Sequence, residues 1–450
     1  MKHEASADDI LKAAIGRRAL LRGGAALTAL GAFGAASQAA VGGGDPVRSS
    51  ARIVIAGAGA AGLACANQLS RRLDGAKITL IDARARHLYQ PGFTLIAAGL
   101  KDAAYSISTT AEWVPQGVEL IEASVAEFDP EGNKVVTDAG QSVPYDFLIV
   151  ATGLKLDWDA VEGFDLKLVG TDGIGAVYAG PEEAAKTWIA LDKFADRGGV
   201  ALFGRPATEM KCAGAPLKFA FITDDHLRRR NNRTKAEIVY AAHSKILFSV
   251  PIVDEKVRML FEDRGFETRH NHVLKAIDPA KKIATYATPE GDTEIGYDFT
   301  NVIPPMRAPD AVRLSPLAWT EGPFAADGWT ESDMQTLRHK RFANVFSVGD
   351  VAGVPKGKTA ASAKWQAPVV VEHLVADIAG TTSDKSYNGY TSCPLITKIG
   401  RAMLVEFDYR NNLVPSFPGV IAPLEELWLT WLMKEVALKP TYLAMVRGEA

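Results

Sequence analysis

The 450-residue sequence contains only three cysteines, at positions 65, 212 and 393. This number is too small for a disulfide scaffold, and no Cys-x-x-Cys pair is present. The eight histidines are scattered, and none lies within a few residues of a cysteine, so zinc-ligand spacing is also missing. We therefore expect no structural metal, and each cysteine needs its own explanation by packing or by redox chemistry.

The chain also lacks a strong charge bias and, beyond its first 40 residues, any apolar run of about 18 residues that would span a bilayer. Its formal net charge is -3, which gives no general attraction to nucleic acid or to acidic lipid. Hydrophobic residues make up 47% of the chain, enough for a large core divided between two or three domains. Any contact with a membrane must come from local features.

The amino-terminal residues 1–40 have the order of features found in an export signal. Arg17 and Arg18 precede two leucines and Arg22, an Ala/Gly-rich run covers 23–36, and Ser37-Gln38-Ala39 has the small-residue pattern of a cleavage site. This segment resembles a twin-arginine signal, which moves folded proteins. We therefore expect export to the periplasm, where a cysteine pair can remain oxidised.

After a glycine-rich linker at 42–46, residues 52–82 follow a complete dinucleotide-binding pattern. A strand at 52–56 leads into Gly57-Ala58-Gly59-Ala60-Ala61-Gly62, a helix is expected to about residue 73, and a second strand at 77–81 ends in Asp82. Gly57 suits the tight turn, Gly59 the approach of a pyrophosphate, and Gly62 close packing of helix on strand. Asp82 lies 20 residues after the last glycine, where a carboxylate binds ribose hydroxyls.

Two later segments complete a flavoprotein pattern. Residues 145–153 form an apolar strand that ends in Thr152-Gly153, and residues 342–350 form another that ends in Gly349-Asp350. Both resemble the flavoproteins with two dinucleotide-binding domains, in which the aspartate of the second segment binds the ribityl chain of FAD. The expected fold class is α/β, with an FAD-binding domain from 50–155 and 311–385 and a second Rossmann-like domain from 156–310.

The second domain has no glycine-rich loop for a nicotinamide nucleotide. Its strand at 200–204 leads into Gly204-Arg205-Pro206-Ala207-Thr208-Glu209-Met210-Lys211-Cys212, in which one glycine of the set remains. The next strand ends near His243 without an evident ribose-binding carboxylate or an arginine for a 2′-phosphate. We therefore expect no binding of NAD(P)H, and a cysteine occupies this turn.

Cys212 and Cys393 each stand among small residues, and we expect both in accessible turns. Cys212 precedes a predicted helix, and Cys393 precedes a predicted strand at 402–409. The alternative is that both are unrelated buried thiols, because free cysteine is commonly buried. The residues alone leave the two interpretations open, whereas Cys65, inside the first helix, is expected to pack.

Several segments together resemble the sulfide:quinone oxidoreductases, and most closely the branch that includes the mitochondrial enzyme. These are Lys-Cys-Ala-Gly-Ala-Pro at 211–216, Tyr-Thr-Ser-Cys-Pro-Leu at 390–395, Val-Glu-Phe-Asp-Tyr at 405–409, His-Leu-Tyr-Gln-Pro at 87–91 with Gln90, and Lys358-Thr359-Ala360-Ala361. The resemblance spans the chain from about residue 50 to its end.

The resemblance implies a redox disulfide between Cys212 and Cys393 that sulfide attacks, leaving a persulfide. The released thiolate, assigned to Cys393, passes electrons to FAD and from there to a quinone, while a thiol or sulfite accepts the sulfur. Positive charge at Lys211 or Lys358 favours a thiolate, and Lys358 with the amides of Thr359 and Ala360 suits negative charge on the flavin ring. No cysteine lies between Cys65 and Cys212, so FAD is expected to be non-covalent.

The carboxyl-terminal segment, 386–450, holds the second cysteine and an amphipathic tail. Apolar residues recur at helical spacing over 424–436, with two tryptophans and with the charges on the opposite side. We interpret this tail as an anchor that rests on the membrane surface. A terminal helix packed on the body of the protein is the alternative.

Three other functions compete with a sulfide:quinone oxidoreductase. The flavoprotein subunit of a flavocytochrome c sulfide dehydrogenase predicts covalent FAD and no membrane-seeking tail. A type II NADH dehydrogenase needs the glycine-rich loop that is missing after Gly204. A non-catalytic flavin-bearing sulfur carrier would bind FAD without being reduced by sulfide.

Overall fold

The computed structural model describes residues 45–449, of which 46–448 form one compact unit. The expected signal at 1–40 lies outside the described residues. Two five-stranded sheets organise the unit, and every strand pairing within each is parallel. Parallel sheets need cover on both faces, so their central strands consist of buried apolar runs.

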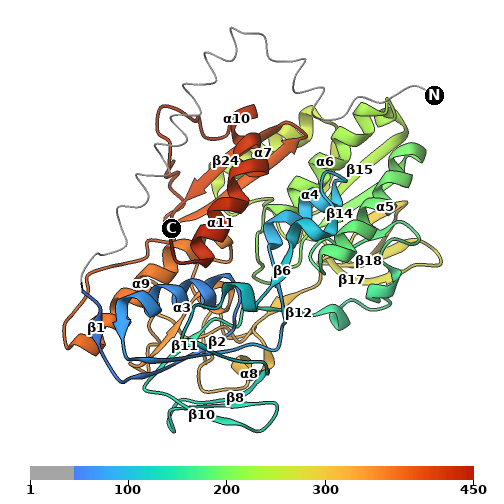
Figure 1. Cartoon of the computed structure of the whole chain (residues 1–450). Helices are drawn as coiled ribbons and strands as arrows, with labels where there is room; N and C mark the ends of the chain where they lie inside the picture. The colour runs from blue at the N-terminus through green and yellow to red at the C-terminus, as the bar shows by residue number, and fades with distance from the viewer. Residues whose placement is uncertain (1–44, 450) are drawn as a thin grey trace, which may run out of the picture. The chain divides into compact units, whose positions relative to one another are not determined.

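The first sheet has the order β22-β11-β2-β4-β7, and its strands β11 and β2 are labelled in Figure 1. Its central strand, β2, is Arg-Ile-Val-Ile-Ala, and four of these five residues are buried. The strands are β22 (Val345–Ser347), β11 (Phe147–Val150), β2 (Arg52–Ala56), β4 (Lys77–Ile81) and β7 (Glu119–Ile121). Sequence-distant strands thus meet in one sheet, because β22 pairs with β11 after the whole second domain has intervened.

The second sheet repeats this plan with the order β13-β20-β14-β15-β16. Its strands are β13 (Ile174–Gly175), β20 (Phe299–Asn301), β14 (Gly199–Gly204), β15 (Ala236–Ala241) and β16 (Phe266–Arg269). Each sheet is accompanied by a three-stranded antiparallel sheet, β10-β9-β8 in the first case and β17-β18-β19 in the second. These are β8 (Val125–Asp129), β9 (Lys134–Thr137), β10 (Ser142–Pro144), β17 (Val273–Asp278), β18 (Ile283–Thr288) and β19 (Gly291–Gly296). This repetition is the predicted arrangement of two Rossmann-like domains.

The other strands form two-stranded pairs. The pair of β12 and β21 joins the segments that connect the two domains, and the antiparallel pair of β23 and β24 stands outside both large sheets. The pairs are β1 (Val47–Arg48) with β3 (Leu73–Asp74), β5 (Arg86–Leu88) with β6 (Ile107–Thr109), β12 (Lys155–Leu156) with β21 (Met306–Arg307), and β23 (Thr391–Lys398) with β24 (Arg401–Phe407).

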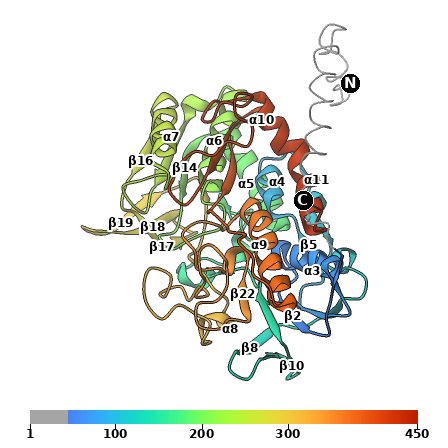
Figure 2. The same ribbon diagram turned by 90° about the vertical axis from the view of Figure 1, so that its left-hand side faces the viewer.

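Helices α3 and α9 lie side by side against the first sheet (Figure 1, Figure 2). Small residues allow α3 to pack closely, and its residue Cys65 is fully buried, where desolvation raises the thiol pKa to about 12. The helices are α3 (Ala60–Arg72), α4 (Phe93–Ala97), α5 (Pro181–Arg197), α6 (Ala215–Arg229), α7 (Pro251–Asp263), α8 (Asp310–Arg313) and α9 (Ala360–Ala379). Cys65 therefore serves packing.

The carboxyl-terminal tail is not one regular helix. It consists of α10 (Trp428–Leu432), a π-helical turn (Met433–Ala437) and α11 (Leu438–Val446). These elements run from β24 toward α3 (Figure 1). No helix within residues 45–449 is both long and apolar enough to cross a membrane.

Candidate active site

One cavity lies where the two domains and the carboxyl-terminal segment meet. The loops that follow β2, β11, β22 and β14 open into it, as expected for ligand sites beyond the carboxyl ends of parallel strands. It is lined by twelve of the residues predicted from the sequence: Gly59, Ala61, Gln90, Thr152, Gly153, Cys212, Gly349, Asp350, Lys358, Thr359, Ala360 and Cys393. Three other predicted residues do not line the cavity: Gly57, Gly62 and Asp82.

Gly57 and Gly62 shape the turn that brings the start of α3 to the cavity. Gly57 has φ +109°, and a Cβ there would collide with the carbonyl of Ala151. A Cβ on Gly62 would collide with the carbonyl of Gly57. With Gly59 as its N-cap and no capping side chain, α3 presents free backbone N–H groups to the cavity. This geometry suits a pyrophosphate.

Asp82 is buried at the end of β4 and holds this turn. Its Oδ2 atom accepts a hydrogen bond of 2.7 Å from the Ala58 amide, and its carboxylate pairs with the Arg84 guanidinium at 2.6 Å. Burial raises the pKa of the Asp82 carboxyl, but the hydrogen bonds and the charge of Arg84 lower it by a larger amount. The net pKa is below its usual value, so the group is ionised. Arg84 itself lines the cavity, so an arginine that the sequence pattern did not indicate stands beside the expected ribose site.

The residues at the ends of β11 and β22 fit a flavin nucleotide. The Oγ1 atom of Thr152 is buried without a hydrogen-bond partner and belongs to the lining of the cavity. Asp350 also lines the cavity, and burial raises its carboxyl pKa. An unpaired hydroxyl, a desolvated carboxylate and the open start of α3 are groups that a polar dinucleotide satisfies.

Lys358 is buried and not a solvated loop lysine. Its amine donates hydrogen bonds to the carbonyls of Asp350 (2.7 Å) and Ala352 (3.2 Å). Desolvation lowers its pKa to about 8. The Thr359 side chain caps the start of α9, so a cation and free helix amides meet at one side of the cavity.

Cys212 sits in the loop between β14 and α6, in a strained backbone conformation. Its φ of +46° is uncommon for a residue with a Cβ. Three hydrogen bonds hold it: its amide donates to the Lys358 carbonyl (2.9 Å), and its carbonyl accepts from the Ala215 amide and the Tyr178 hydroxyl, each at 2.8 Å. Such over-determined strain is found most often at functional sites.

Cys393 differs from the prediction, because it is neither in a turn nor accessible. It lies in β23, opposite Val405 of β24, and is 5% exposed. Pro394 and the small residues around Cys393 are typical of loops and mask the apolar alternation of this strand. The sequence therefore predicted a turn here. Both sulfur-bearing residues nevertheless line the same cavity.

The two cysteines are unbonded and face each other. The Cys393 thiol hydrogen-bonds to the Cys212 sulfur, which lowers the pKa of Cys212 well below its usual value despite burial. The same hydrogen bond, together with burial, raises the pKa of Cys393. In the reduced pair, Cys212 is therefore the thiolate and Cys393 the thiol.

The cations beside Cys212 are not those expected from the sequence. Among the charges that lower its pKa, the leading ones belong to Lys218 and Lys434, whereas Lys211 donates to Gln90 Oε1 at 2.7 Å and Lys358 to backbone carbonyls. Lys218 Nζ lies 3.6 Å from Cys212 Sγ. The sequence did contain a signal for this role. Lys218 is a charged residue within the otherwise apolar start of α6, six residues after Cys212.

Lys434 is a residue of the tail that the sequence did not connect with the site. It is 2% exposed, lines the cavity and donates to the Pro91 carbonyl at 2.5 Å. Burial and the neighbouring charge of Lys218 lower its pKa to about 7. It belongs to the π-helical turn, a geometry common at functional sites, and no local pattern indicates such a turn.

Comparison with known proteins identifies the family. The chain is 34% identical over 369 residues to the mitochondrial sulfide:quinone oxidoreductase of Mus musculus, covering 81% of this chain and 80% of that protein. It is 35% identical over 368 residues to the mitochondrial enzyme of Dictyostelium discoideum, covering 82% and 80%. The chain belongs to the sulfide:quinone oxidoreductase family.

Two further matches agree with this assignment. Residues 51–181 match the family described as pyridine nucleotide-disulphide oxidoreductase. The fold is similar to that of the sulfide:quinone oxidoreductase of Aquifex aeolicus, with a TM-score of 0.72 at 22% identity, covering 90% of this chain and 92% of that one. The predicted family, the α/β fold and an FAD-dependent oxidoreductase are thereby confirmed.

Within the described residues, no group of three or more His, Cys, Asp and Glu side chains is placed to hold a metal ion.

Proposed function

We propose that this chain oxidises sulfide through Cys212 and Cys393 and passes the electrons by way of FAD to a quinone. The observation that carries this proposal is the pairing of the two sulfurs within a cavity that also contains the start of α3 and the ends of β11 and β22. A dinucleotide held at those elements would lie in the same cavity as both sulfurs.

The charge of the cavity supports an anionic sulfur substrate. Its lining includes six basic side chains, Arg84, Arg86, Lys211, Lys218, Lys358 and Lys434, against one acidic side chain, Asp350. Hydrosulfide and sulfite are anions at neutral pH, and a thiol reacts as its thiolate. A cationic cavity raises the local concentration of each.

The pKa directions favour a particular order of attack. Hydrosulfide attacks the Cys393 sulfur of a Cys212–Cys393 disulfide, the S–S bond breaks, and Cys212 leaves as the thiolate while Cys393 carries the persulfide. A sulfur with a low thiol pKa is the better leaving group, and Cys212 has the lowered pKa. This reverses the roles expected from the family resemblance, which assigned the released thiolate to Cys393.

The remaining steps return the cysteines to the disulfide. An acceptor thiolate or sulfite attacks the outer persulfide sulfur and removes it, which frees the second cysteine sulfur. When bound, FAD supplies an acceptor for two electrons and passes them to the quinone. Loss of these two electrons re-forms the S–S bond, so one hydrosulfide and one acceptor yield one sulfane sulfur product, one proton and two electrons.

We also propose that FAD is held without a covalent bond. Cys65 is fully buried behind the wall of the cavity, and the two cysteines that line it are needed as the redox pair. A flavoprotein subunit with covalently attached FAD would require a further accessible cysteine.

Localisation is part of the proposal. Residues 1–40 support export by the twin-arginine route, and export to an oxidising compartment suits a resting disulfide. The tail supports contact with a membrane surface, because Val420, Trp428 and Val436 are exposed apolar side chains on or next to its helices. A quinone dissolved in the bilayer would then be close to the enzyme.

The test is anaerobic addition of sulfide to the purified yellow protein, followed by decylubiquinone. We expect the flavin absorbance to bleach with sulfide and to return with the quinone. Flavin that stays oxidised, or that bleaches but is not reoxidised by the quinone, contradicts the proposal.

Cysteine variants assign the chemistry. Cys212→Ser and Cys393→Ser are each expected to slow flavin reduction by sulfide at least about 100-fold, because neither retains a disulfide to attack. Cys65→Ser is the matched control and should reduce at close to the wild-type rate. Mass spectrometry of the sulfide-treated protein should find the persulfide on Cys393.

A further inference from the structure

Cys393 is carried by a ribbon that neither large sheet holds. Among the named strands of residues 45–449, β23 and β24 pair only with each other, and β24 adds single bridges to Leu413 and Leu427. A two-stranded ribbon is marginally stable without further packing. No ladder of a larger sheet therefore sets the position of Cys393 relative to Cys212. That position must come from contacts between the ribbon and its surroundings.

The ribbon packs along α6, the helix that follows Cys212. At the start of α6, Gly214 is so close to Cys393 Sγ that a Cβ would need the sulfur to move, and Leu395 is the next neighbour. At the end of α6, Asp225 and Arg229 contact Ile399, the residue after β23. Helix α6 and strand β23 are therefore in contact from the two cysteines at one end to a group of polar contacts at the other.

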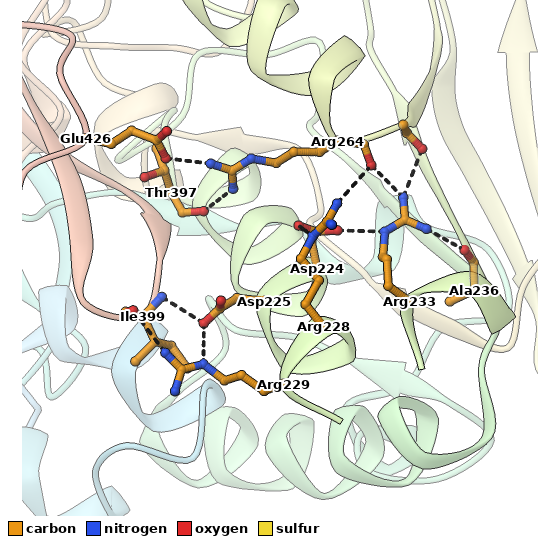
Figure 3. Close-up of polar contacts among 11 residues, drawn as sticks. Asp224, Asp225, Arg228, Arg229, Arg233, Ala236, Arg264, Thr397, Ile399 and Glu426 are labelled. Carbon is orange, nitrogen blue, oxygen red and sulfur yellow. Dashed lines mark hydrogen bonds and ion pairs between the residues drawn. The ribbon is translucent and has the colours of Figure 1, made fainter. Parts of the chain in front are cut away.

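The polar end is a set of charged contacts, which we name the arginine clamp: Asp225, Arg229 and Arg264 (Figure 3). Asp225 Oδ2 accepts from the Ile399 amide at 3.1 Å and from Arg229 Nε at 2.7 Å, and Arg229 donates to the Ile399 carbonyl at 3.1 Å. Both backbone groups of Ile399 are therefore bound by α6.

Arg264, just after α7, contributes the second half of the clamp. It donates to the Thr397 carbonyl and pairs with Glu426 at 2.5 Å. Its side chain is 13% exposed and lies over the Phe221 ring of α6, 4.7 Å from the centroid. Buried, forked guanidinium contacts of this kind have a defined geometry.

We propose that the arginine clamp positions Cys393 opposite Cys212 by fixing the register of β23 against α6. The inference rests on the proposed role of the two cysteines. Side chains alternate between the two faces of a strand, so a slip of one residue would turn Cys393 away from Cys212. The three residues act through the cysteine pair and do not touch the reacting sulfur.

The helix provides a matched control one residue away. Arg228 and Arg229 each pair with an aspartate four residues earlier, Asp224 at 2.8 Å and Asp225 at 2.7 Å, and their side chains are 48% and 54% exposed. Arg228 donates to the Arg264 carbonyl, and Asp224 also binds Arg233, so these contacts remain within the second domain (Figure 3). Only Arg229 of the two reaches the ribbon.

The experiment compares Arg229→Gln with Arg228→Gln in the FAD-loaded, reduced protein. Peptide-mapped alkylation of Cys212 by iodoacetamide across pH gives its thiol pKa, and mass spectrometry gives the fraction of Cys212–Cys393 disulfide after mild oxidation with diamide. In Arg229→Gln we expect the Cys212 pKa to rise by about one unit or more, because its hydrogen bond from Cys393 is lost, and the disulfide fraction to fall. Arg228→Gln should match the wild type in both.

Equal values of both quantities in the two variants would overturn the proposal. A change in melting temperature alone, common to both variants, would do the same. Arg229→Lys keeps a charge beside Asp225 but loses the forked contact to Ile399, so we expect an intermediate Cys212 pKa; a wild-type value would attribute the effect to charge and not to register. If Arg229→Gln does not fold, the same two measurements are made on Arg229→Lys.

Neither measurement requires sulfide or a quinone. A wild-type protein that fails to react with sulfide would therefore defeat the proposed function, while the comparison of Arg229→Gln with Arg228→Gln would still decide whether the clamp sets the geometry of the two cysteines.

Discussion

At the scale of single residues, the reactivity of the cysteine pair depends on which of the two thiols holds the proton. The hydrogen bond between the two thiols is the largest cause that lowers the pKa of Cys212 and raises that of Cys393, whereas the charge of Lys218 acts on both sulfurs. The shared proton therefore lies on Cys393, and Cys212 is the thiolate. Lys218 and Lys434 add positive charge that favours the Cys212 thiolate.

Substitution of Lys218 should move this proton equilibrium. Its amine is 3.6 Å from Cys212 Sγ, so Lys218→Met removes the nearer cation and should raise the Cys212 pKa by about one to two units. The alkylation rate of Cys212, measured against pH in the reduced protein, reports the shift. Lys356→Met is the control, because Lys356 donates to Ser249; an unchanged profile in Lys218→Met would refute this role.

Lys434 should add a pH dependence near neutrality. Its pKa is lowered to about 7 by burial, so the amine is charged below that pH and neutral above it. Flavin reduction by sulfide should decline as the pH rises through about 7, because Cys212 then loses a favourable cation. Lys434→Met should lack this limb and run at the lower rate throughout; a limb that persists in the variant would assign it to another group.

At the scale of elements, the tail has two faces with different functions. Lys434 of the π-helical turn lies inward, whereas Trp428 of α10 and Val436 of the same turn are more than half exposed. Lys434 and Tyr442 line the cavity, so deletion of the tail would remove part of the site and could not test membrane binding separately. Point substitutions on the outer face avoid this difficulty.

The double substitution Trp428→Ser and Val436→Ser should weaken binding to liposomes by about tenfold, because it removes two apolar side chains from the proposed contact. Co-sedimentation measures the binding, and flavin reduction by sulfide in solution should be unchanged. Leu314→Ser, an exposed residue of the α8 region at 75% exposure, is the control. Equal liposome binding in all three proteins would mean that the tail only packs on the protein.

At the scale of the whole molecule, one domain plan is used twice for different purposes. The first domain keeps the short glycine turn from β2 to α3, whereas the second separates β14 from α6 by residues 205–214. That longer connection carries Cys212 at the place where a second dinucleotide would meet the helix start. A redox cysteine thus occupies the position of a nicotinamide-binding loop.

NADH and NADPH are therefore expected to be poor reductants. Each should reduce the flavin at least about 100-fold more slowly than sulfide at equal concentration, because the loop offers no cradle for the pyrophosphate. Stopped-flow absorbance under anaerobic conditions makes the comparison. Rapid bleaching by NADH would instead favour a dehydrogenase function.

Local sequence was sufficient to predict the fold and many of the residues that line the cavity. The turn at Gly57, the strand ends at Thr152 and Asp350, and the helix start at Thr359 depend on residues close together in the chain, and their spacing is preserved in the structure. The motifs around Cys212 and Cys393 also indicated both cysteines, although the strand around Cys393 read as a turn.

The charged surroundings of the cysteines required the tertiary structure. Lys218 and Lys434 are separated by more than 200 residues of chain, and only the packing of the tail against β24 and α3 brings both to one sulfur. The arginine clamp likewise joins Asp225 to Ile399, which are 174 residues apart in the chain. Hydrophobic periodicity and glycine spacing are local properties, whereas the charge next to a buried thiolate is a property of long-range packing.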